Sequence, residues 1–134
     1  MSWGTQRLEW RHGLLFEGED AREFRFPISG DPAEVGAKPS DLLPLALASC
    51  LAYDVVVVLG KKRQDLAGLT VTIVSEQQDL APLRFTRITL RFEARGRVEE
   101  TAAARALELA EKNCPVLASI DPAVEIVSSI KVVA

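Results

Sequence analysis

The longest apolar run of the chain predicts its central element. Every residue from 42 to 59 is apolar, aromatic or small except Asp54. The run follows Ser40 and Asp41, either of which is a suitable N-cap, so we expect a helix that continues to about Lys62. Apolar side chains surround the middle of this helix, and such a helix must be enclosed by protein. In a chain of 134 residues we expect complete enclosure to need a second subunit.

Alternating apolar and polar positions predict strands on both sides of this helix. Residues 6–10 and 14–17 flank a turn at residues 11–13, which indicates a hairpin, and residues 23–28 read as a third strand. A loop rich in Gly, Pro and Asp follows at residues 29–38. Beyond the helix we expect strands at residues 69–74, 85–94 and 124–133 and a second helix at residues 99–113.

Length and charge restrict the class of protein. A chain of this length forms one domain, which we assign to residues 1–134. The net charge of −3 argues against a nucleic-acid partner, because binding phosphates needs a basic face. The apolar run is just long enough to cross a bilayer, but Pro44 and Asp54 favour a core helix and no membrane contact. Without a secretory signal, two cysteines indicate a reducing compartment, and we expect a cytoplasmic protein.

Cys50 and Cys114 carry the candidate chemistry. Cys50 lies within the predicted central helix, and Cys114 ends the second helix directly before a proline, so the two thiols could meet as a redox couple. The alternative is that Cys50 only fills space as a small hydrophobe. Asp54 shares a helix face with Cys50, and burial and a nearby carboxylate both raise a thiol pKa. Cys50 therefore needs a cation from elsewhere; Arg11 is the first candidate, with His12 and Arg22 as weaker ones.

Other kinds of site have little support. The only thiol or imidazole ligands are Cys50, Cys114 and His12, and no CxxC or HxxxH spacing occurs, so zinc would have to recruit Asp54 or a glutamate. Phosphate-binding glycine motifs are absent from the sequence, and no nucleophile elbow accompanies the single histidine. We expect neither a metal nor a cofactor.

Three segments carry a resemblance to a known family. Residues 38–56, KPSDLLPLALASCLAYDVV, resemble the central helix of the osmotically inducible protein C and organic hydroperoxide resistance (OsmC/Ohr) superfamily, in which Leu-rich and Ala-rich turns end in small-small-Cys. Residues 110–116, AEKNCPV, resemble its helix-ending Cys-Pro, and residues 85–92, FTRITLRF, resemble its Phe-Thr-x-Ile strand. The match extends from about residue 39 to the C-terminus and keeps the order of elements.

The resemblance implies an α+β, OsmC-like fold in which antiparallel sheets surround a long central apolar helix and two chains intertwine as a homodimer. It also implies a thiol peroxidase for organic hydroperoxides. Cys50 would attack the peroxide and form a sulfenic acid, Cys114 would resolve it as a disulfide, and an external dithiol would reduce that disulfide. Residues 10–13, WRHG, resemble the turn whose arginine activates the attacking cysteine, which assigns that role to Arg11.

One departure from the family pattern concerns the acid that holds this arginine. The hydroperoxide-resistance branch has a glutamate ten residues before the first cysteine, where this chain has Ser40, with Asp41 one position later. Asp41 either reaches the arginine or caps the helix, and we favour the cap. An acid at this position together with Cys-x-x-x-Asp, here Cys50 and Asp54, is similar to a less understood OsmC-like branch.

Two other functions stay open at this point. The chain could be a non-catalytic dimer that binds a small apolar molecule or senses redox state, or it could bind a metal. The separation of the two sulfurs discriminates between the non-catalytic dimer and the peroxidase, because the peroxidase must form a disulfide and a disulfide requires close Cβ atoms.

Overall fold

The computed structural model describes residues 3–133. They fall into two compact units that meet between Leu43 and Pro44. We call them the N-terminal unit and the C-terminal unit and describe each by itself. The prediction of one domain over residues 1–134 stays a prediction.

The N-terminal unit is a three-stranded antiparallel sheet. Its strands β1 (Arg7–His12), β2 (Leu15–Glu19) and β3 (Arg25–Ser29) lie side by side in that order, which confirms the predicted hairpin and third strand. The turn is shorter than expected, with Gly13 at a φ of +54°, and Arg11 is the extra residue of an irregularity between Trp10 and His12. Arg11 therefore belongs to β1 and not to the turn.

The central helix forms as predicted, but it begins differently. A 3-10 turn, η1 (Pro39–Asp41), leads directly into α1 (Leu42–Lys61). Lys38 is the N-cap, and no side chain makes a cap bond there, so the expectation that Ser40 or Asp41 caps the helix is wrong. The reason is that Pro39, with its fixed φ and missing N–H, already starts the helical turn, which places both residues inside it.

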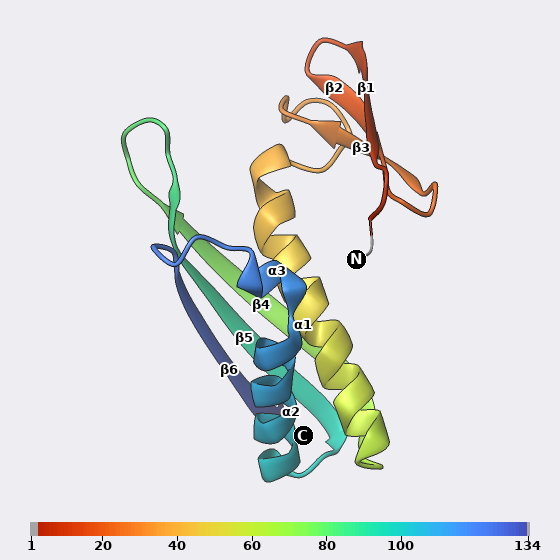
Figure 1. Ribbon diagram of the computed structural model, residues 1–134, viewed down its shortest axis with the longest axis vertical. Helices are drawn as coiled ribbons and strands as arrows, with labels where there is room; N and C mark the ends of the chain where they lie inside the picture. The colour runs from red at the N-terminus through yellow and green to blue at the C-terminus, as the bar shows by residue number, and fades with distance from the viewer. Residues whose placement is uncertain (1–2, 134) are drawn as a thin grey trace. The chain divides into compact units, whose positions relative to one another are not determined.

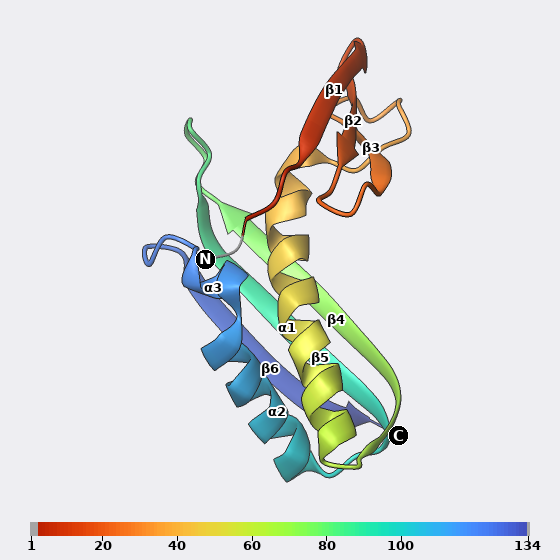
Figure 2. The ribbon, with the colours of Figure 1, turned by 45° about the vertical axis from the view of Figure 1, so that its right-hand side comes forward.

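The C-terminal unit packs helices on one face of a mixed sheet. Strands β4 (Asp65–Gln77), β5 (Phe85–Arg97) and β6 (Glu125–Val133) form the sheet, and α1 and α2 (Glu100–Asn113) lie across the same face of it (Figures 1 and 2). The four-residue helix α3 (Pro115–Ala118) follows α2.

The α+β class with a central helix is confirmed, but the expectation of antiparallel sheets needs one correction. β4 and β5 are antiparallel, whereas β5 and β6 are parallel. The parallel pair arises because the chain crosses back over the sheet through α2 and α3 before it enters β6, and parallel neighbours require such a crossover.

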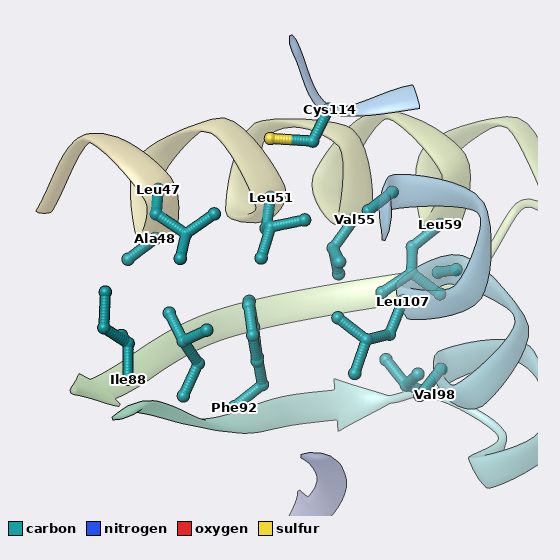
Figure 3. Packing of buried hydrophobic residues seen from close by; sticks show 14 residues of the cluster. Leu47, Ala48, Leu51, Val55, Leu59, Ile88, Phe92, Val98, Leu107 and Cys114 are labelled. Carbon is teal, nitrogen blue, oxygen red and sulfur yellow. The ribbon is translucent and has the colours of Figure 1, made fainter. Parts of the chain in front are cut away.

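The core of the C-terminal unit lies between α1 and the sheet. Leu47, Leu51, Val55 and Leu59 recur every fourth residue along α1 and are completely buried. Figure 3 shows them facing side chains of β5, among which Phe92 is 1% exposed. Burying this much apolar side-chain area is the main stabilising contribution to the unit. The core therefore fixes one face of α1 against the sheet.

The opposite face of α1 stays exposed in the single chain. Leu45, Tyr53 and Val56 are 51%, 70% and 48% exposed. By length and composition the segment Pro39–Lys61 could also cross a membrane, but the core helix of a soluble protein passes the same test, so this is weak evidence.

Candidate functional site

The structure brings the two predicted thiols together within the C-terminal unit. Cys50, on α1, is half-buried, and Cys114, between α2 and α3, is 2% exposed. Both thiols are free, and the side chain of Cys114 lies close enough to that of Cys50 to raise the pKa of Cys50. The predicted meeting of two sulfurs that lie 64 positions apart in the sequence (114 minus 50) is therefore present in the fold.

The Cys-Pro sequence explains the position of Cys114. A residue before proline is restricted to extended backbone, and Cys114 has φ −79° and ψ 112°. It therefore ends α2, while Pro115 starts α3 as its first residue. The backbone N–H of Leu117 donates to Cys114 Sγ at 3.3 Å, so this thiol is also the N-cap of α3. Figure 3 shows the Cys114 side chain lying against α1.

The surroundings of Cys50 favour its protonated form. Burial raises the pKa of the Cys50 thiol, and the neighbouring side chain of Cys114 raises this pKa further. The backbone amide of Val116 lowers this pKa, whereas Asp54 raises it. The net shift is upward, so within the C-terminal unit Cys50 is a thiol at neutral pH and needs an added cation to react as thiolate.

Arg11, the predicted cation, lies in the N-terminal unit. Its Nη2 is 2.6 Å from Glu17 Oε1, and its Nη1 is 3.5 Å from Glu9 Oε2. Within residues 3–133 Asp41 takes part in no ion pair or side-chain hydrogen bond, so Glu17 and Glu9 hold Arg11 there. The pairing of Arg11 with Cys50 stays a prediction.

The weaker cation candidates have other surroundings. His12 is 67% exposed, with Nδ1 3.8 Å from Glu34 Oε1. Arg22 lies exposed in the turn that Asp20 organises by accepting the Arg22 and Phe24 amides. In the part of the chain that the structure describes, no three His, Cys, Asp or Glu side chains gather as metal ligands.

Two parts of the site were missed by the sequence reasoning. The amides of Val116 and Leu117 approach the two sulfurs, and a thiol directly before a proline that starts a helix was the available signal. Glu17 was missed as the partner of Arg11. The alternation of charge in β1 and β2 was the signal there, because Glu9 and Glu17 are paired across the strands.

Comparisons with known proteins place the chain among related sequences. A family model described as OsmC-like protein matches residues 30–129. The protein YhfA of Escherichia coli strain K12 is 38% identical over 130 residues, covering 96% of this chain and 97% of YhfA.

Solved structures extend the comparison to the fold. A hypothetical protein from Aquifex aeolicus VF5 superposes with a TM-score of 0.88 at 26% identity, covering 98% of this chain and 97% of that one. The organic hydroperoxide resistance protein OhrB of Bacillus subtilis superposes with a TM-score of 0.64 at 15% identity, covering 95% and 98%. The latter likeness concerns the fold alone.

Proposed function

The chain belongs to the family of OsmC-like proteins, and on this premise we propose that it is a cysteine-based thiol peroxidase that reduces organic hydroperoxides. One observation carries the proposal: Cys50 packs against the core cluster that contains Cys114, and the two thiols are close enough for Cys114 to raise the pKa of Cys50. A second supports it by analogy, since a protein with the same fold is named an organic hydroperoxide resistance protein.

The two thiols differ in burial, which gives them different roles. Cys50 is half-buried, whereas Cys114 is almost completely buried, so a peroxide reaches Cys50 first. The Cys50 thiolate attacks the O–O bond; the distal oxygen becomes a sulfenic acid on sulfur, and the alkoxide takes a proton and leaves as an alcohol. The Cys114 thiol then attacks this sulfur, which forms the disulfide and releases water. An external dithiol reduces the disulfide to two thiols and is itself oxidised.

The first step requires a cation, and we propose Arg11. A guanidinium beside Cys50 would oppose the upward pKa shift that burial and Asp54 cause. Glu17 and Glu9 hold the Arg11 side chain, and we propose that Glu17 orients it in place of the family's glutamate. Asp41 remains a second candidate for orienting Arg11. Among residues 3–133 its side chain makes no ion pair or hydrogen bond.

We also propose that the working form is an intertwined homodimer. The exposed face of α1 carries Leu45, Tyr53 and Val56, and the sheet of the N-terminal unit exposes Leu8 and Trp10. A second copy would cover both surfaces, and its apolar side chains would favour organic hydroperoxides over hydrogen peroxide. The free thiols fit the reducing conditions of the cytoplasm.

Thiol titration before and after addition of cumene hydroperoxide tests the proposal. We expect the wild type to lose both of its thiols per chain and Cys50→Ser to lose none. Cys114→Ser should lose its single thiol to sulfenic acid and should turn over only once. Unchanged peroxide turnover in Cys50→Ser would refute the proposal.

A second candidate function is a non-catalytic, redox-sensing dimer. The raised pKa of Cys50 favours it, because a protonated thiol is a slow nucleophile. In that case the wild type would form the disulfide slowly and would not consume peroxide through repeated cycles when a dithiol is supplied.

A further inference from the structure

Asp54 is the one acidic residue within an otherwise apolar helix. It and the terminal Lys61 are the only charged residues of α1. Asp54 is half-buried, and within residues 3–133 its carboxylate takes part in no ion pair or side-chain hydrogen bond. A partly buried carboxylate without a partner is costly, so its position requires an explanation.

The position of Asp54 relative to Cys50 offers one. Side chains four residues apart on a helix are neighbours on the same face. Both side chains are half-buried, so water screens the interaction between them only in part. A negative carboxylate here disfavours a negative sulfur one turn away.

The other groups that face Cys50 do not compensate for this charge. From the α2–α3 junction Cys114 and the backbone amide of Val116 approach Cys50. The side chains of β5 that form the core with α1 are apolar and include Ile88, Leu90 and Phe92. Among the groups that raise the pKa of Cys50, Asp54 is the one side-chain carboxylate.

We infer that Asp54 is a positioning residue whose carboxylate, four residues from Cys50 on the same helix face, adds to the effect of burial in keeping this thiol protonated and so moves the pH range in which the sulfur reacts upward. The inference rests on the proposed function, in which Cys50 is the attacking thiol. In that function the thiol stays protonated and unreactive until a cation approaches it. The chemistry of the inference itself concerns only the loss of a proton from Cys50, which can be measured without any peroxide.

The test is the pH profile of alkylation of Cys50 by iodoacetamide in the full-length protein. A Cys114→Ser background leaves one thiol, so that a single group titrates. Asp54→Asn removes the charge at nearly constant volume, and Asp54→Glu keeps it. Asp65→Asn, at the exposed start of β4, is the matched control for loss of one negative charge.

We expect Asp54→Asn to move the profile to lower pH. The sign follows from the interaction: without the carboxylate the thiolate is less disfavoured, so a larger fraction of Cys50 is ionised at pH 7. The rate at pH 7 should rise roughly three- to tenfold, while the plateau rate at high pH stays the same. Asp54→Glu and Asp65→Asn should follow the parent profile.

Two results would overturn the inference. An unchanged profile would mean that Asp54 does not act on Cys50, and a shift to higher pH would mean that Asp54 holds a cation there. If Asp54→Asn does not fold, Asp54→Ser, which also removes the charge, must show the same downward shift. Failure of the proposed function would be seen separately. A wild type that keeps its thiols in the hydroperoxide titration could still show the expected shift in the pH profile of alkylation.

Discussion

The two units of the chain achieve burial to very different degrees. In the C-terminal unit a helix layer on a sheet buries a continuous core, which includes Leu51, Ile88 and Phe92. Among residues 3–43 of the N-terminal unit only Gly18 and Ser29 are buried. A sheet without a covering layer leaves its apolar face open to solvent, whereas a helix packed on a sheet closes it.

The difference is one of architecture and not of apolar content. One face of the N-terminal sheet carries Trp10, Phe16 and Phe26 at neighbouring positions. Trp10 nevertheless stays 66% exposed. In the single chain this sheet therefore buries little apolar surface, while the C-terminal unit already contains its own core.

The largest expected effect comes from removing a core side chain of the C-terminal unit. Phe92→Ala should lower the free energy of unfolding by about 3–5 kcal/mol, because it leaves a cavity under α1. Phe24→Ala in the N-terminal unit, where the ring is 65% exposed, should cost less than about 1 kcal/mol. Urea denaturation at one protein concentration measures both. Similar losses in the two variants would contradict the contrast between the units.

A smaller effect is expected from a charge on the exposed face of α1. Val56→Asp should weaken the proposed homodimer by about 2 kcal/mol, roughly 30-fold in the dissociation constant, because the carboxylate would be buried in the interface. Val74→Asp is the matched control, since Val74 is 42% exposed on β4 and Val56 48% on α1. Analytical ultracentrifugation gives both constants. If both variants weaken the dimer equally, the exposed face of α1 is not the dimer interface.

The smallest expected effect concerns the proposed pairing of Arg11 with Cys50. Arg11→Ala should slow alkylation of Cys50 at pH 7 about tenfold, because the thiolate loses its proposed cation. Arg7→Ala is the control, since both arginines lie on β1 and both pair with Glu9. Iodoacetamide rates followed by mass spectrometry measure the change. If Arg11→Ala and Arg7→Ala give the same rate, Arg11 does not serve Cys50.

The elements with strong patterns were predictable. The apolar run gave α1 to within a residue of its end, and alternation gave the hairpin of β1 and β2. The prediction from sequence was wrong or incomplete at three local features: the start of the central helix at Pro39, the shorter turn beside Arg11 and the four-residue helix α3. At each of these, proline or an irregularity in strand pairing overrides the propensity of neighbouring residues.

The candidate site was predictable in its residue types but not in its geometry. Cys50 and Cys114 stood out by their positions, and the effect of Asp54 followed from its spacing to Cys50. The sulfur contact and the amide of Val116 depend on how α2 ends over α1, which no local pattern encodes.

The sequence by itself determined where α1, α2 and the cores of the strands lie, since hydrophobic periodicity acts over a few residues. The parallel pairing of β6 with β5 and the meeting of the two thiols were decided by tertiary structure. The physical reason is that both depend on burial of apolar faces from distant segments against one another, and that burial is a property of the assembled core.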